Sequence, residues 1–113
     1  MHEMALAESV LGIVEDYARR EAARRVRTVR LAIGRLSNVE VEAIRFCFDA
    51  VTRGSVADSA VLDIEEVPGT GWCMRCAEQV PLASPADACP QCGAYEVAVT
   101  GGTEMTVKEL ELE

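Results

Sequence analysis

The chain has a single histidine, His2, and it is the second residue of the sequence. A metal site that uses imidazole is therefore confined to the N-terminal end. Aromatic side chains make up only 4% of the residues, so a hydrophobic core must consist mainly of valine, leucine, isoleucine and alanine. No apolar run approaches the roughly 20 residues that a transmembrane helix needs, which excludes a membrane-spanning protein.

The first residues also lack the pattern of a secretory signal, because Glu3, Glu8 and Glu15 interrupt the apolar positions and no basic leader precedes them. Five cysteines without such a signal fit a reducing cytoplasm better than a disulfide framework. The net charge of −8 disfavours non-specific nucleic-acid binding, which needs many Lys and Arg contacts to phosphates. We therefore expect a small cytoplasmic protein with neither nucleic acid nor membrane as a partner.

Hydrophobic periodicity predicts the order helix, strand, helix, strand, metal module, strand. The helices are expected at residues 4 to about 22 and from Ser37 to about Arg53, where Ser37 and Glu40 have the spacing of a capping box. The strands are expected at 26–33, 60–67 and about 103–112. Because the last strand must return to the same sheet, the turn-rich segment before it is an insertion.

The alternation of the last predicted strand slips. Met105 and Val107 share one parity, whereas Leu110 and Leu112 share the other. A β-bulge near Lys108 would place all four on one face.

Four cysteines form two C-x-x-C pairs with 12 residues between the pairs: Cys73, Cys76, Cys89 and Cys92. Two such turns can complete a tetrahedron of sulfur around one ion, which favours structural zinc over an iron site and over disulfide or redox chemistry. Gly93 after the second pair permits the tight turn. Residues 69 to about 95 hold too few large apolar side chains to fold alone, so metal is expected to stabilise them. Cys47, between two phenylalanines of the second helix, is expected to be a buried free thiol.

The N-terminus can form a second, nitrogen-rich site. The amine of Met1 with the amide and imidazole of His2 would close two fused chelate rings, and the Glu3 amide would add a fourth nitrogen. Four nitrogens in a plane suit Ni(II) or Cu(II), and the Glu3 carboxylate could bind or orient the imidazole. This signal is weak on its own, because terminal residues are usually disordered, but the adjacent helix anchors the terminus.

Seven of the eleven basic residues lie between Arg19 and Arg35. Such a cluster could dock an acidic partner. Solvation of a strand face and stabilisation of a helix C-terminus are the favoured interpretation.

Four segments together resemble the HypA/HybF family, the nickel metallochaperones of NiFe-hydrogenase maturation: Met1-His2-Glu3, the stretch from Gly34 to Glu40, Phe46-Cys47-Phe48-Asp49, and the paired C-x-x-C insert. The likeness spans essentially the whole chain in the same order. It implies an α+β fold with two helices packed on a three-stranded antiparallel sheet. Residues 1–67 and 100–113 would form the nickel-binding domain, and 68–99 the zinc-binding module.

The resemblance implies a metallochaperone rather than an enzyme. Nickel would be held by Met1, His2 and Glu3, and Glu40 matches a place in the family where an acidic residue can lie close to the nickel. Cys73, Cys76, Cys89 and Cys92 would hold structural zinc. The implied partners are the accessory GTPase that supplies nickel, the hydrogenase large-subunit precursor that receives it, and in some relatives the urease accessory proteins.

One departure is that the C-x-x-C pairs have no neighbouring histidine, so histidine exchange at zinc is not available to this chain. A zinc-ribbon adaptor that never handles nickel is the alternative function that the cysteine pairs alone would allow.

Overall fold

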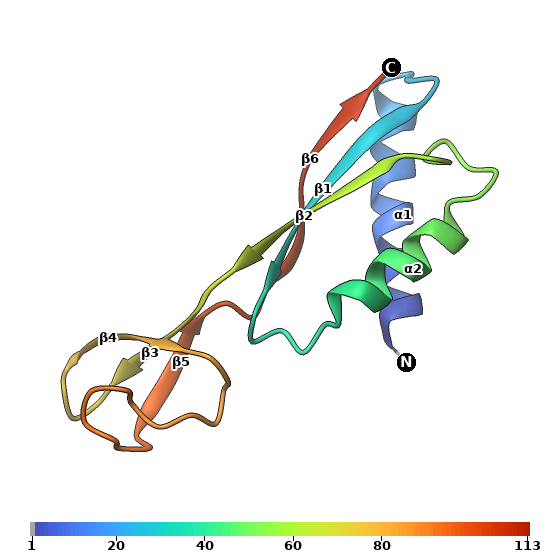
Figure 1. Cartoon of the computed structure of the whole chain (residues 1–113). Coiled ribbons are helices and arrows are strands. Elements are labelled where there is room, and N and C mark those ends of the chain that lie inside the picture. The colour runs from blue at the N-terminus through green and yellow to red at the C-terminus, as the bar shows by residue number, and fades with distance from the viewer. Residues whose placement is uncertain (1) are drawn as a thin grey trace. The chain divides into compact units, whose positions relative to one another are not determined.

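The structure is a computed structural model, and it describes residues 2–113. In this range the chain folds into α1 (His2–Arg20), β1 (Val26–Gly34), α2 (Val41–Val51), β2 (Val61–Val67), β3 (Gly69–Cys73), β4 (Glu78–Leu82), β5 (Val97–Gly101) and β6 (Met105–Leu112) (Figure 1). The expected helices and strands are all present. Periodicity does not predict β3, β4 and β5, which lie in and next to the turn-rich segment of residues 69 to about 95. None of the described helices is both long and apolar enough to cross a membrane.

The strands form two three-stranded sheets, in the orders β2-β1-β6 and β4-β3-β5. In the first sheet β6 runs against β1. The Glu113 amide donates to the Arg25 carbonyl, and the Gly34 amide donates to the Glu104 carbonyl, which are at opposite ends of the two strands. In the second sheet β3 is the central strand, antiparallel to both β4 and β5.

β2 runs in the same direction as β1, as the arrows in Figure 1 show. The Val26 amide donates to the Val56 carbonyl just before β2, and the Arg35 amide donates to the Val67 carbonyl at its end. Parallel neighbours need a long crossover, which α2 supplies here. The first sheet therefore contains the three strands expected for it but is mixed, whereas an antiparallel sheet was predicted.

Two compact units divide the chain. Unit 1 comprises residues up to Leu31, Val39–Glu65 and Thr106–Glu113, and unit 2 comprises Ala32–Asn38 and Glu66–Met105. Unit 1 holds both helices, which pack against each other on the same side of the sheet (Figure 1). Unit 2 holds the second sheet and the four paired cysteines.

The buried stripe of α1 consists of small and β-branched residues at three- and four-residue steps: Ala7, Val10, Val14 and Ala18. Apolar periodicity predicts a buried face made of Leu6, Val10, Ile13, Val14 and Tyr17, but Ile13 and Tyr17 are instead 44% and 50% exposed. The stripe is rotated because two alanines, which periodicity arguments overlook, face the core. Their small side chains allow α1 to approach its neighbours closely.

α2 begins at Val41 and not at Ser37, so the predicted capping box is wrong. The Ser37 hydroxyl donates to the Gly34 carbonyl at 2.6 Å and closes a turn, and Glu40 is the N-cap residue without a side-chain cap bond of its own. The helix buries Ile44, Cys47 and Phe48. Cys47 is therefore the buried free thiol that its position predicted.

β6 shows the expected change of parity. Met105 and Val107 are half-buried, Lys108 and Glu109 are both exposed, and burial resumes at Leu110 and Leu112.

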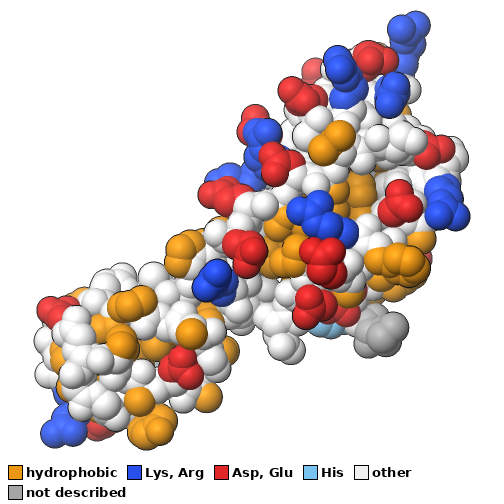
Figure 2. All heavy atoms as spheres, viewed as in Figure 1, with side chains coloured by type: hydrophobic (Ala, Val, Ile, Leu, Met, Phe, Trp, Pro, Cys, Tyr) orange, Lys and Arg blue, Asp and Glu red, His pale blue; other side chains and the backbone are white. Residues whose placement is uncertain are grey.

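Most arginines of the 19–35 cluster pair with carboxylates, as a solvated charged surface would. The pairs are Arg19–Asp16 at 2.7 Å, Arg27–Glu113 at 3.9 Å, Arg30–Asp63 at 2.9 Å, Arg30–Glu109 and Arg35–Glu66 at 3.8 Å. Arg30, on the central strand, links both neighbouring strands. Figure 2 shows basic side chains gathered over the end of unit 1 that carries the α1–β1 turn.

Candidate metal centres

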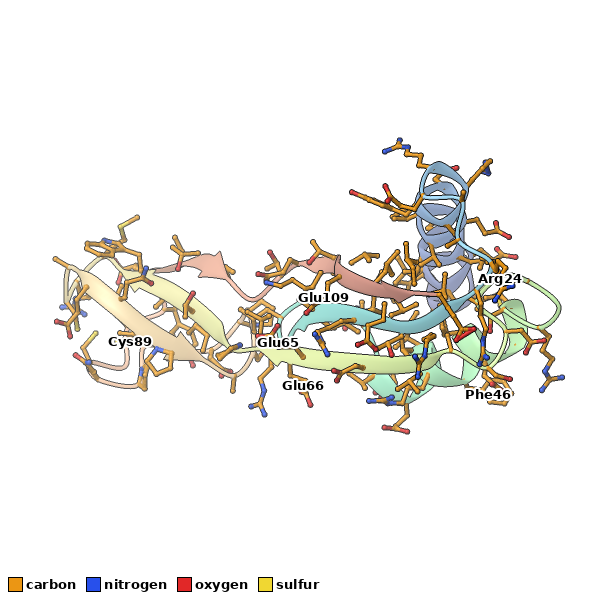
Figure 3. All side chains as sticks on the ribbon, turned by 90° about the horizontal axis from the view of Figure 1, so that it is seen from above. Arg24, Phe46, Glu65, Glu66, Cys89 and Glu109 are labelled. Atoms are coloured by element: carbon orange, nitrogen blue, oxygen red, sulfur yellow. The ribbon has the colours of Figure 1, made fainter. Side chains whose placement is uncertain are left out.

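The two C-x-x-C pairs meet in unit 2. Cys73 ends β3 and Cys76 lies in the turn to β4, whereas Cys89 and Cys92 lie in the loop between β4 and β5 (Figure 3). All four sulfur atoms lie within 4.8 Å of one another. Cys73 and Cys89 are buried and Cys92 is exposed, so the site lies at the edge of the unit.

The spacing of the sulfurs fits a tetrahedral ion. Cys73 Sγ lies 3.6 Å from Cys92 Sγ, and Cys76 Sγ lies 3.9 Å from Cys89 Sγ. A tetrahedron with metal–sulfur bonds of about 2.3 Å has edges of about 3.8 Å. A disulfide would require about 2.05 Å. The donor set therefore suits a thiolate-bound ion, and its four protein ligands leave no position for water.

Each pair forms a turn that aims backbone amides at a sulfur. The Cys76 amide lies 3.3 Å from Cys73 Sγ, and the Gln91 amide lies 3.4 Å from Cys89 Sγ. Amides in these positions donate to thiolate charge and fix the ligands. The residue after each pair is left-handed: Gly93 has φ +77° and Ala77 has φ +55°. The two turns are thus alike, although only one of them carries the expected glycine.

Without a metal ion the thiols titrate very differently. The backbone amides of Cys92 and Gln91 stabilise the Cys89 thiolate and lower its pKa to about 7. The hydrogen bond to the Cys92 sulfur, together with desolvation, raises the pKa of Cys76 to about 12. A metal ion that binds all four sulfurs near neutral pH must therefore displace the Cys76 proton, and uptake of the ion releases protons.

The apolar core of unit 2 is small and includes two of the ligands. Its buried members are Leu36, Cys73, Val80, Leu82 and Cys89, with Cys76 and Val97 packed against them. So few side chains cannot offset the conformational entropy of ordering this segment. The four-cysteine site is therefore the main source of stability that the unit has available.

Replacing Ala77 by glycine is expected to stabilise unit 2. A left-handed L-residue costs about 1–2 kcal/mol, whereas the added freedom of glycine in the unfolded chain costs about 0.5–1 kcal/mol. We expect a higher thermal midpoint and slower loss of metal to a chelator. Gly93→Ala is the opposite change at the equivalent position and should destabilise unit 2. A Cβ there would meet nothing within 4 Å, so the substitution would add only backbone strain. Equal behaviour of both variants would contradict this account.

The predicted nitrogen site lies at the start of α1. His2 is helical, and its side chain is 52% exposed. Its Nδ1 lies 3.7 Å from the Glu3 carboxylate, which is 15% exposed. Amides in the first turn of a helix have no intrahelical acceptor, so the His2 and Glu3 amides are free of that bond. Met1, whose amine was predicted to join the site, lies outside the described residues.

Glu3 links the start of α1 to the start of α2. The Glu40 amide donates to the Glu3 carboxylate at 3.2 Å, which supplies the cap that α2 lacks locally. This bond is the largest cause that lowers the pKa of Glu3, and the Glu3 backbone amide adds to it. The Glu40 side chain is exposed. Among residues 2–113, only the four cysteines bring three or more ligand atoms together.

The family model that matches residues 1–112 is HypA, described as hydrogenase/urease nickel incorporation, metallochaperone. A curated relative, hydrogenase maturation factor HypA of Dechloromonas aromatica (strain RCB), is 64% identical over all 113 residues and over its own full length. The protein of the same name from Azoarcus sp. (strain BH72) is also 64% identical, over 99% of this chain and 98% of its own.

Two solved structures share the fold. The solution structure of the Ni metallochaperone HypA from Helicobacter pylori aligns with a TM-score of 0.70 and 25% identity, over 99% of this chain and 97% of its own. A second solution structure of a HypA protein aligns with a TM-score of 0.73 and 27% identity, over 100% of this chain and 97% of its own.

Proposed function

Because the chain belongs to the HypA family of nickel-incorporation metallochaperones, we propose that it binds Ni(II) at its N-terminus and delivers it for maturation of NiFe hydrogenase. The family consists of metallochaperones rather than enzymes, and the similar proteins of Dechloromonas aromatica and Azoarcus are hydrogenase maturation factors. The observation that carries the nickel proposal is the position of His2, exposed in the first turn of α1.

The proposed nickel ligands are the Met1 amine, the amides of His2 and Glu3, and the His2 imidazole. They supply four nitrogens in one plane, which suits Ni(II). The amides of the first helical turn support this set, because coordination would break no bond to a helix carbonyl. The Glu3 amide would give up only its bond to the Glu3 carboxylate. A planar site at a chain end is open on both faces, so an incoming ligand can take the nickel without unfolding the protein.

We assign the Glu3 carboxylate an orienting role. It already accepts the Glu40 amide and lies near the imidazole, so it can hold the His2 end against α2. The backbone amide of Glu40 contacts Glu3, and the exposed Glu40 side chain is proposed as a neighbour of the nickel.

Glu3→Gln is expected to loosen the start of α2. Because the pKa of Glu3 is lowered from its ordinary value of 4.5, the stabilisation exists above that ordinary value and disappears as pH falls through the lowered one. We expect faster hydrogen exchange at the Glu40 amide and loss of its acid titration in nuclear magnetic resonance spectra. Glu8→Gln, an exposed change on the same helix, is the control and should alter neither. An unchanged Glu40 amide in Glu3→Gln would contradict the contact.

The four cysteines are proposed to hold zinc in a structural role, because four thiolates close its coordination sphere. Domain roles follow: residues 1–67 with 100–113 would handle nickel, and 68–99 would hold zinc. We further propose the cytoplasm as the location, because the zinc site needs reduced cysteines and the cytoplasm keeps thiols reduced. The proposed partners are the accessory nickel GTPase, the hydrogenase large-subunit precursor and the urease accessory proteins.

Nickel titration by calorimetry tests the function on a chain with its native, untagged N-terminus. We expect one nickel per chain and weaker binding as pH falls from about 8 to about 6, because protons compete for the imidazole, amine and amides. Metal analysis of the same sample should give one zinc. Affinity that does not change with pH would refute the nitrogen site, and absence of nickel binding would favour the zinc-ribbon adaptor.

A further inference from the structure

A groove of about 340 Å³ runs between α1 and β6 in unit 1. Ile13 and Tyr17 form its helical wall, and both are about half exposed. Val107, Leu110 and Leu112 form its strand wall. The change of parity in β6 is what places these three on one groove, since strict alternation would turn Val107 away from the two leucines. The nickel and cysteine sites use none of these residues.

The strand wall is also a sheet edge. β6 is the last strand in the order β2-β1-β6, so along its outer side the described residues provide no further strand. An open edge presents unpaired amides and carbonyls, which natural proteins usually cover or use for binding. An extended segment that pairs with such an edge gains main-chain hydrogen bonds, and its alternate side chains enter the adjoining groove.

The charges at one end of the groove indicate what the segment must carry. The Arg24 and Arg25 amides donate to the Glu113 carbonyl at 2.9 and 3.3 Å, which places this turn beside the end of β6 (Figure 3). Both side chains are exposed, and among the described residues neither pairs with a carboxylate. The Arg20 guanidinium lies 5.6 Å from the centre of the Tyr17 ring. In a chain of net charge −8, this is a local basic site.

The charges on the groove itself do not oppose this assignment. Glu109 is paired with Arg30, and Glu113 lies 3.9 Å from Arg27. Glu21 is the one lining carboxylate without a salt bridge among the described residues, and it precedes Arg24 by three residues at the arginine end. Arg20, Arg24 and Arg25 outnumber this single carboxylate, so the net charge at the arginine end is positive.

We propose that this groove docks an extended segment of a partner protein, in which apolar residues alternate and acidic residues follow at the arginine end. The segment would add to β6 as a fourth strand that runs parallel to β6, place its apolar side chains between α1 and β6, and direct the carboxylates that follow them to Arg24 and Arg25. This surface is separate from nickel binding and does not depend on it.

A second copy of the chain fits less well. Its own C-terminal stretch, Glu109-Leu110-Glu111-Leu112-Glu113, has the required acidic and apolar alternation. In an antiparallel pair of two β6 strands, however, that end would lie beside the beginning of the other β6, away from Arg24 and Arg25. Charge complementarity therefore favours a different protein as the occupant.

The test uses the full-length, nitrogen-15-labelled protein and a blocked synthetic peptide in which valine alternates with glutamate or threonine and two aspartates follow. A matched peptide carries lysine at every acidic position. We expect the acidic peptide to shift the amide signals of β6 and of α1 around Ile13, with affinity that falls as salt increases. The lysine peptide should bind at least about tenfold more weakly.

Two variants locate the contact. Ile13→Glu is expected to weaken the acidic peptide by at least about tenfold, and Arg24→Glu with Arg25→Glu should remove most of the salt dependence. Phe46→Glu is the matched control, because Phe46 is 75% exposed on α2 and lies outside the groove. Circular dichroism verifies that each variant folds.

The proposal is overturned if neither peptide binds, if both peptides bind equally, or if Phe46→Glu weakens binding as much as Ile13→Glu. It is also overturned if the protein forms a dimer in light scattering that Ile13→Glu dissociates, since the groove would then hold a second copy.

Discussion

Replacing Cys73 by alanine is expected to abolish metal binding at the cysteine site and to unfold unit 2. Cys73 is fully buried, belongs to the core of the unit and supplies one of four sulfurs. A structural zinc contributes about 10–16 kcal/mol in small peptides, far more than the few apolar contacts of this core can replace. Metal analysis should show loss of zinc. The amide signals of β3, β4 and β5 should collapse toward random-coil positions, and the emission of Trp72, the single tryptophan of the chain, should shift as its strand unfolds.

The control is Cys47→Ala, the same change at the one cysteine outside the cluster. Cys47 is buried on α2, so this variant should lose some stability in unit 1 and retain its metal. In Cys73→Ala, nickel binding at the N-terminus should persist, because none of the proposed nickel ligands belongs to unit 2. A Cys73→Ala protein with one zinc and an intact second sheet would show that three sulfurs suffice and that the closed four-sulfur site is wrong.

The elements of unit 1 could be predicted because their side chains follow a period. Val29 and Leu31 alternate along β1, Ile44 and Phe48 repeat along α2, and all four are buried. The direction of β2 was also within reach, because a helix between two neighbouring strands permits a parallel pair. The rotation of α1 was harder to predict, because its buried stripe depends on two alanines.

The short strands of unit 2 have no clear periodic pattern of apolar residues. β3 contains two glycines, Gly69 and Gly71, and added Cβ atoms there would collide with Leu82 and other neighbours. Glycine at these positions lets neighbouring segments approach the β3 backbone closely. A search for helix or strand periodicity in apolar residues does not detect such positions. The pairing register between β3 and β5 also shifts between Thr70 and Gly71. The spacing of the cysteines was a better guide to this unit than any propensity.

The cap of α2 illustrates what a local pattern cannot find. Ser37 and Glu40 match the capping box, yet Ser37 closes a turn with Gly34 and the bond to the Glu40 amide comes from Glu3. The two partners are 37 residues apart in sequence. Only the packing of α1 against α2 brings them together, so the link between the proposed nickel ligands and α2 had no sequence signal.

His2→Ala is expected to lower nickel affinity by more than the roughly 10–100-fold that follows from loss of a supporting contact. The imidazole is the only side-chain nitrogen among the proposed ligands, and without it the chelate keeps one ring fewer. The His2 side chain is half exposed and its only described side-chain contact is with Glu3 at 3.7 Å. The fold and the zinc content should therefore be unchanged, which calorimetry, metal analysis and circular dichroism can establish on one sample.

The matched control is Met4→Ala, an exposed change in the same helical turn, which should bind nickel as the native chain does. A chain whose Met1 amine is acetylated should bind as weakly as His2→Ala, because the amine and the imidazole close the two ends of one chelate. If His2→Ala retains its affinity while the acetylated chain loses it, nickel is held by the amine and other ligands. If both retain it, nickel binds elsewhere on the chain and the assignment of the N-terminus is wrong.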